Sequence, residues 1–216
     1  MADPAKRDAR RYHSPRRAEQ AAQTRHAVLE AARDLFVSNG YAVTTVAEIA
    51  RAARVAIDTV YATVGRKPAL LRAVLESAIS GSDVAVAAEQ RDYVARTQAA
   101  LSARDKLTAY VSGLVEIQSR IAPVFLALRD AAGNDPDSAV LWKEISDRRA
   151  ANMRRFAADL RSTGELRDDL TDDDVADIVW SMNGTEYWVL LTGERGWSPQ
   201  RFAAYLIDAW SRLLLA

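Results

Sequence analysis

The stretch TTVAEIARAARVAIDTVY, residues 44–61, predicts two short helices joined by a tight turn. Thr45 is placed to cap the first helix, and Glu48 follows three residues later, as a capping box requires. Residues 53–55 form the turn, and a second helix follows over residues 57–64. Two short helices that cross at such a turn make a helix-turn-helix, whose second helix enters the major groove of DNA. The stretch therefore predicts a DNA-binding head.

Composition places the rest of the chain in the all-α class. The 216 residues are 49% apolar and 27% charged, with few Gly and Pro and no long β-branched alternation, so we expect nine or ten helices. The lack of Cys excludes disulfides and thiolate metal sites. Apolar runs are short and the basic N-terminus has no apolar core behind it, so we expect no membrane span and no signal peptide. A cytoplasmic protein is the expectation.

The net charge of zero hides an uneven distribution of charge. Residues 1–72 carry 13 Lys and Arg against 7 Asp and Glu, a balance of +6. Residues 73–216 carry 16 against 22, a balance of −6. A basic head on an acidic body is what a phosphate-binding end attached to a different kind of domain would show.

Breaks in the helical pattern divide the chain into three parts. Residues 1–17 are basic and almost without apolar side chains, which predicts a disordered arm. This arm either adds contacts to DNA or is a solvated terminus. Residues 18–66 form the helix-turn-helix domain, and residues 67–216 form a helical body. Within the body, Pro123 predicts a kink or a new helix start.

The head resembles the tetracycline-repressor-like (TetR) family of transcriptional regulators, with matched spacing from residue 28 to residue 71. This resemblance implies a homodimeric repressor that binds a palindromic DNA operator and is released by a small-molecule inducer, without a cofactor. Residues 67–216 would then be the ligand-binding and dimerisation domain. The matched residues are Val28-Leu29-Glu30-Ala31-Ala32, Leu35-Phe36, Gly40-Tyr41, Thr44-Thr45-Val46, Ile49-Ala50, Val55, Thr59-Val60-Tyr61, Lys67 and Leu70-Leu71.

By resemblance, part of the head contacts phosphates and part of it presents to base edges. Thr44, Thr45, Tyr61 and Lys67 are the expected phosphate contacts, although Tyr61 could instead be a core aromatic residue. The predicted DNA-binding residues are Arg16, Arg17, Thr44, Thr45, Arg54, Ala56, Ile57, Asp58, Thr59, Tyr61, Thr63 and Lys67.

The head departs from the family pattern at Val64-Gly65, which replace the usual aromatic residue after the Tyr, and at two positions in and after the turn. Arg54 stands where the family usually has Gly in the turn, and a non-Gly residue in the left-handed conformation costs about 1 kcal/mol. Ala56 stands where the family often has a capping Ser. Arg54 is placed to add a phosphate contact. Asp58 either accepts from a base or only stabilises the helix N-terminus.

In the body, a helix over residues 172–192 is apolar on two faces, so we expect one face in the subunit core and the other against a partner. Paired with its copy, the last helical hairpin would make a four-helix bundle. The predicted dimer-interface residues are Val175, Val179, Met182, Val189, Phe202, Leu206, Trp210 and Leu213. The candidates to line a ligand cavity are Tyr110, Leu114, Phe125, Trp142, Arg149, Trp180, Asn183 and Tyr187.

Catalysis has little support in the sequence. The only histidines are His13 in the arm and His26, which we expect on the exposed face of the first helix. Asp172, Asp173 and Asp174 could form a metal cluster, but the dipole of the helix that they begin explains them more simply. We therefore expect no enzyme and no metal. The alternative function is an all-helical ligand-binding or scaffold protein whose head no longer reads DNA sequence.

Overall fold

The computed structural model describes residues 15–82 and 90–216, and this part of the chain is all-α, as predicted. Most of the predicted arm, residues 1–14, lies outside the described residues. The helices are α1 (Pro15–Asn39), α2 (Val46–Ala52), α3 (Ile57–Thr63), α4 (Lys67–Ser80), α5 (Asp92–Ala99), α6 (Ala103–Ala132), α7 (Pro136–Arg161), α8 (Asp172–Met182), α9 (Thr185–Trp188), the π-helical segment η2 (Val189–Glu194) and α10 (Pro199–Leu214).

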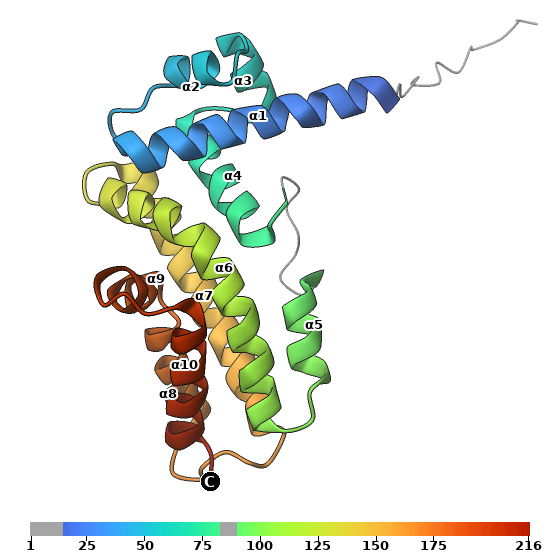
Figure 1. The fold of residues 1–216 in the computed structure, drawn as a ribbon, viewed down its shortest axis with the longest axis vertical. Helices are drawn as coiled ribbons and strands as arrows, with labels where there is room; N and C mark the ends of the chain where they lie inside the picture. Colours follow the sequence, from blue (N-terminus) through green and yellow to red (C-terminus); the bar gives the residue numbers. More distant parts are fainter. Residues whose placement is uncertain (1–14, 83–89) are drawn as a thin grey trace, which may run out of the picture.

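The head lies across one end of an elongated body (Figure 1). α1 runs roughly perpendicular to the long helices, with α2 and α3 on its outer side, and α4 descends from the head towards the body. The long helices α6 and α7 pack along the body, with α5 on one side and α8 and α10 on the other. This arrangement places α3 at the end of the molecule that is farthest from the C-terminus.

Two hydrophobic cores hold this arrangement together. The first joins α1 to α4 with the C-terminal half of α6 and the start of α7, through residues such as Phe36, Leu70 and Phe125. The second fills the far end of the body between α6, α7, α8 and α10. The predicted domain boundary at residue 66 remains a prediction, and α4 shares the first core with residues on both sides of it.

Local sequence signals explain where several helices begin. Asp135 caps α7 by accepting a hydrogen bond from the backbone N–H of Ser138 at 2.8 Å, and Pro136 occupies the first turn. Ser198 and Pro199 begin α10 in the same way. Thr171 and Asp174 form a reciprocal capping box at the start of α8. Each of these starts is fixed by a capping side chain within the first turn of the helix.

The prediction of one continuous helix over residues 172–192 is wrong. The helix ends at Met182, resumes as α9 at Thr185, and widens to a π-helix at Val189. The side-chain amide of Gln118 on α6 donates to the backbone carbonyl of Asn183 at 2.7 Å. A side chain that bonds to the backbone at a break replaces the helical hydrogen bonds that are lost there.

α6 is a single helix that continues through Pro123, so the alternative of a new helix start is wrong. Within the described residues it is the one helix long and apolar enough, by length and composition, to cross a membrane. Half of that apolar stretch is buried inside the protein. Its packing against α4, α5, α7 and α10 is that of a core helix.

Candidate nucleic-acid interface

α2 and α3 are fixed on α1 by a small set of fully buried side chains. Ile49 of α2 and Val60 of α3 have no exposed surface, and they pack in one core with Val28 and Phe36 of α1. Arg25 of α1 adds a hydrogen bond of 3.2 Å to the backbone carbonyl of Thr63, at the end of α3. The recognition helix is therefore held by side chains on its inner face, and its outer face is left free.

The first helix of the motif begins with the predicted capping box. The hydroxyl of Thr45 accepts from the backbone N–H of Glu48 at 3.2 Å, and the Glu48 carboxylate accepts from the backbone N–H of Thr45 at 2.8 Å. These hydrogen bonds lower the pKa of Glu48, because they favour its ionised form. The capping box fixes the angle at which the chain enters α2.

The turn before α3 has the left-handed backbone conformation at Arg54 that the sequence predicted. Arg54 has φ of 57°, the one positive φ outside glycine in the described residues. Its neighbour Val55 donates its backbone N–H to Ala50 at 3.0 Å, which closes the turn. Ala56 occupies the N-cap of α3 with extended backbone and no side-chain hydrogen bond. The Arg54 side chain is exposed beside α3, where a phosphate could be reached.

The outer face of α3 carries the residues expected to read DNA. Ile57 is 43% exposed and Tyr61 is 47% exposed, and Ala56 and Asp58 are also exposed. The alternative interpretation of Tyr61 as a core aromatic residue is therefore wrong, because Val60 is the buried residue of α3. An apolar group and a carboxylate on the same exposed face are suited to a thymine methyl and a cytosine amino group.

Two residues predicted to contact phosphate, Thr44 and Lys67, make contacts within the head. Thr44 is buried, and its hydroxyl lies 2.8 Å from the carbonyl of Gly40 and 3.1 Å from that of Leu35, closing the loop after α1. Lys67 donates to the carbonyl of Ala42 at 3.1 Å and lies 4.3 Å above the ring of Tyr41. Burial lowers the pKa of Lys67. As placed here, Thr44 cannot reach a phosphate, and Lys67 is held by the loop.

The remaining predicted DNA contacts lie at the edge of the head. Arg16 and Arg17 are exposed at the start of α1, which projects beyond the rest of the head (Figure 1). Thr45 is exposed, and Thr59 and Thr63 are half-buried. Two arginines that the sequence reasoning missed are also exposed, Arg51 in the last turn of α2 and Arg66 directly before α4. Their position in or directly after the motif was the available signal.

Part of the predicted ligand set comes together in the body, where its members hydrogen-bond to one another. The Asn183 amide donates to the Tyr110 hydroxyl at 2.8 Å and accepts from Arg149 at 2.7 Å. The Arg149 guanidinium also lies 4.9 Å from the ring of Trp180. Burial raises the pKa of Tyr110 above its ordinary value. Gln118, which the sequence reasoning missed, completes this polar cluster through the carbonyl of Asn183.

The other ligand candidates lie elsewhere. Phe125 packs on Trp142 with ring centroids 4.7 Å apart, in the first core. Leu114 is buried in the second core, and the Tyr187 hydroxyl donates to the Tyr205 hydroxyl at 3.0 Å. None of the eight candidates lines either of two clefts, of about 700 and 730 Å³, that lie where the head meets the body.

Most of the residues predicted at the dimer interface are buried inside the subunit, so these residue assignments are wrong in this conformation. The C-terminal helical hairpin as the interface stays a prediction. Met182 and Val189 are half-buried, and Leu213 is 42% exposed. The stripe that we assigned to a partner is instead the face that packs on α6 and α7. The buried residues are Val175, Val179, Phe202, Leu206 and Trp210.

The three aspartates at the start of α8 cap the helix or pair with arginines. Asp174 closes the capping box, Asp172 pairs with Arg161 at 2.9 Å, and Asp173 lies 3.4 Å from Arg154. In the parts of the chain that the structure describes, no group of three His, Asp or Glu side chains is placed to hold a metal ion.

Comparison with known proteins agrees with this geometry. Residues 28–74 match the sequence model of the bacterial regulatory proteins of the tetR family. No curated protein matches the sequence of the chain. Three solved structures share its fold at low sequence identity, and likeness of this kind concerns the fold alone.

The first is NalD, the secondary repressor of the MexAB-OprM multidrug efflux pump in Pseudomonas aeruginosa, at 21% identity and a TM-score of 0.67, covering 90% of this chain and 98% of that one. The second is a putative transcriptional regulator from Saccharomonospora viridis in complex with choline, at 20% identity and a TM-score of 0.65, covering 90% of this chain and 98% of that one. The third is a putative TetR-family transcriptional regulator from Rhodococcus sp., at 18% identity and a TM-score of 0.66, covering 90% of this chain and 99% of that one. Residues 28–74 of this chain therefore carry the sequence pattern of the tetR family of bacterial regulatory proteins, and the described part of the chain shares the fold of these three structures.

Proposed function

We propose that this protein is a cytoplasmic, ligand-responsive transcriptional repressor, which binds a near-palindromic operator as a homodimer and is released by a small-molecule inducer. The observation that carries the proposal is the outer face of α3. Ile57, Asp58 and Tyr61 are exposed there, while Val60 anchors the helix to α1. A rigid helix with a free face at the end of the molecule is suited to the major groove.

The residues of the head divide by role in this proposal. Ile57 and Asp58 contact base edges, and Tyr61, Thr45 and Arg54 contact phosphates, which position the helix without reading sequence. Arg16 and Arg17 extend the basic surface along α1. Two heads about 34 Å apart would place their recognition helices one turn of B-DNA apart.

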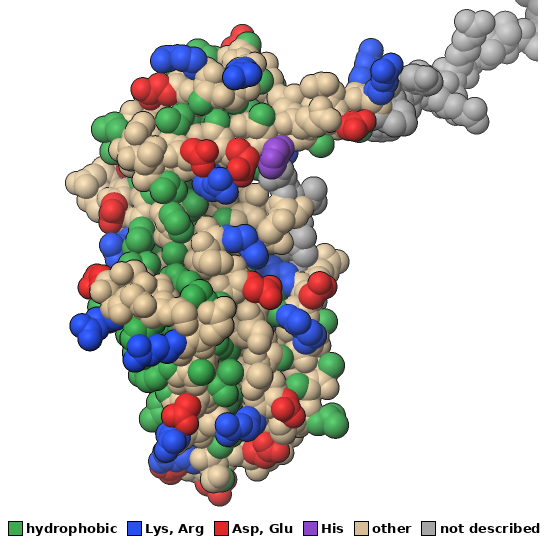
Figure 2. Space-filling model, in the orientation of Figure 1, with side chains coloured by type: hydrophobic (Ala, Val, Ile, Leu, Met, Phe, Trp, Pro, Cys, Tyr) green, Lys and Arg blue, Asp and Glu red, His purple; other side chains and the backbone are tan. Residues whose placement is uncertain are grey.

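The homodimer would form on the side of the body where apolar side chains remain exposed. Trp180 of α8, Leu190 of η2, and Tyr205 and Leu213 of α10 are all at least 36% exposed. Hydrophobic side chains form a band along this side of the body (Figure 2). Large exposed apolar residues that recur on one hairpin favour an interface. These residues replace the buried stripe in our account of the dimer.

The link from body to head runs through α4. Arg72 pairs with Glu144 of α7 at 2.6 Å, and Glu76 pairs with Arg148 of α7 at 3.4 Å. A small molecule that binds the body more tightly in one arrangement of α6 and α7 would move α4, and with it the head. The polar cluster of Tyr110, Arg149 and Asn183 adjoins these helices, which supports an inducer site there.

DNA binding is the decisive test of this function. Duplexes from the region upstream of the protein's own gene would be titrated by fluorescence anisotropy at several salt concentrations. We expect specific binding with steep salt dependence. Tyr61→Ala and Ile57→Ala should each weaken it about tenfold, or about 1.4 kcal/mol, because each removes a contact from the free face of α3.

Leu101→Ala is the matched control, because Leu101 is 91% exposed in the body and lies far along the chain from the head. It should leave operator affinity unchanged. If neither α3 variant changed the operator affinity, or if unrelated duplexes bound equally tightly, the alternative of a protein whose head no longer reads DNA sequence would be favoured.

A further inference from the structure

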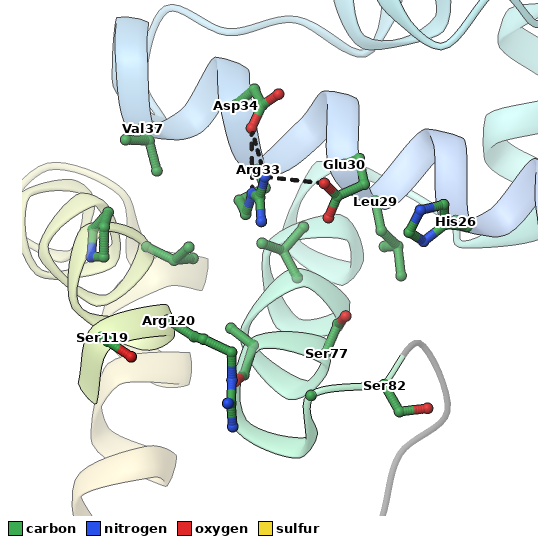
Figure 3. A pocket seen from close by; sticks show the side chains of 15 residues that line it. His26, Leu29, Glu30, Arg33, Asp34, Val37, Ser77, Ser82, Ser119 and Arg120 are labelled. Carbon is green, nitrogen blue, oxygen red and sulfur yellow. Dashed lines mark hydrogen bonds and ion pairs between the residues drawn. The ribbon is translucent and has the colours of Figure 1, made fainter. Parts of the chain in front are cut away.

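A cleft of about 700 Å³ lies where head and body meet, and its size is in the range of small-molecule sites. We call it the junction cleft. It is lined by residues within 26–37 of α1, 74–82 at the end of α4, and 119–124 of α6 (Figure 3). None of the residues predicted from the sequence to bind ligand or DNA contributes to it. It is therefore separate from the proposed operator surface and from the polar cluster in the body.

The lining of the junction cleft is apolar at its base. Leu29 of α1, Val74 of α4 and Val124 of α6 are buried side chains that contribute to the lining, and Ala78 and Pro123 adjoin them. Three helices thus supply apolar surface to one concave site, which suits the apolar part of a small molecule.

The charged groups at the rim are not equivalent. On α1, Arg33 pairs with Glu30 at 2.9 Å and with Asp34 at 3.1 Å, so these two carboxylates share one cationic partner (Figure 3). On α6, Arg120 donates its Nε–H to the carbonyl of Ala78 at 3.1 Å. Within residues 15–82 and 90–216, neither terminal nitrogen of Arg120 has a hydrogen bond or a carboxylate partner.

The position of the Arg120 guanidinium indicates which chemical group the junction cleft would bind. Its guanidinium lies at the C-terminal end of α4, beside Gly81, where it meets the cleft (Figure 3). The two terminal nitrogens of a guanidinium match the two oxygens of a carboxylate, and hydrogen bonds between charged partners are the strong ones. The group that this cation fits is a carboxylate attached to an apolar body.

We propose that the junction cleft binds a small organic carboxylate, whose anionic group pairs with Arg120 and whose apolar part packs on Leu29, Val74 and Val124. Since the lining comes from the head helix α1 and the body helix α6, the bound molecule contacts both. Its binding is therefore sensitive to how the head sits on the body. The binding itself does not depend on the proposed repressor function.

The test uses three probes that share one apolar body and differ in charge: 3-phenylpropionate, 3-phenylpropan-1-ol and 3-phenylpropylammonium. Each is titrated into the full-length protein by calorimetry, without DNA. We expect 3-phenylpropionate to bind more tightly than the alcohol, and the ammonium to bind most weakly. Tightest binding by the ammonium would overturn the proposal, because it would assign the site to Glu30 and Asp34.

Variants locate the binding. Arg120→Gln should weaken the affinity for 3-phenylpropionate at least about tenfold and leave the affinity for 3-phenylpropan-1-ol unchanged, because only the charged contact is lost. Arg129→Gln is the matched control, because Arg129 is an exposed arginine of the same helix that lines neither cleft. Ser119→Trp, at an exposed position on the rim, should abolish binding by filling the cleft. Full affinity in both Arg120→Gln and Ser119→Trp would place the carboxylate elsewhere and refute the proposal.

Discussion

The recognition helix α3 and the last helix α10 carry the same kind of sequence pattern and use it in opposite ways. On α3, Ile57 and Tyr61 are exposed and Val60 alone is buried. On α10, the apolar stripe that we expected to meet a partner is buried in its own subunit, with Trp210 fully enclosed. The two helices differ in the number of neighbours that surround them.

α3 is a seven-residue helix on the surface of the head, whereas α10 packs against α6, α8 and η2. A helix with one main packing side has one buried face, and its other side is free for function. A helix among several neighbours has most of its apolar surface covered within the subunit, and only residues such as Leu213 remain for a partner. Periodicity therefore identifies a buried stripe without identifying what buries it.

The largest expected effect compares the two aromatic residues of these helices. Trp210→Ala should lower the free energy of unfolding by about 3–5 kcal/mol, because it empties a fully buried site in the second core. Tyr61→Ala, on the free face of α3, should change it by less than about 0.5 kcal/mol. Urea unfolding at one protein concentration measures both. Equal losses would mean that α3 is as enclosed as α10.

An intermediate effect separates the surface of α10 from its core. Leu213→Glu should weaken the dimer at least about tenfold, or about 1.4 kcal/mol, because it places a charge on the exposed apolar band. Sedimentation velocity over a range of concentrations measures the dissociation. Val140→Glu is the control, at an exposed apolar position on α7. A dimer that tolerates Leu213→Glu as well as the control would exclude this side of the body.

The smallest expected effect concerns the turn before α3. Arg54→Gly relieves the strain of a left-handed backbone, and the greater flexibility of Gly in the unfolded chain offsets part of the gain. The net stabilisation should be below about 1 kcal/mol.

The same variant should reduce the salt dependence of operator binding by about one phosphate contact. Arg51→Gly, inside α2, is the contrasting change and should destabilise by about 1 kcal/mol. An unchanged salt dependence in Arg54→Gly would remove Arg54 from the set of phosphate contacts.

The sequence was most informative where a few neighbouring residues decide the outcome. The capping box of Thr45 and Glu48, the left-handed Arg54 and the start of α7 at Asp135 were all predictable, because each depends on contacts within one turn of helix. The exposed face of α3 was predictable for a related reason, since the inner residues of a short surface helix are few.

Other features depend on residues that are distant in sequence. The break at Asn183 is stabilised by Gln118, which lies 65 positions away. Thr44 is buried because its hydroxyl closes a loop onto the end of α1. The Arg120 side of the junction cleft exists because α6 passes beneath α1 and beside the end of α4. None of these contacts has a local signature.

The sequence by itself therefore determined the helical class, the helix-turn-helix and most helix starts, because periodicity and capping act over a few residues. Only the tertiary structure decided which apolar stripes the subunit buries, which polar side chains satisfy one another, and where a cleft remains. The physical reason is that burial and electrostatic pairing depend on which helices meet, and α6 meets partners from both the head and the far end of the chain.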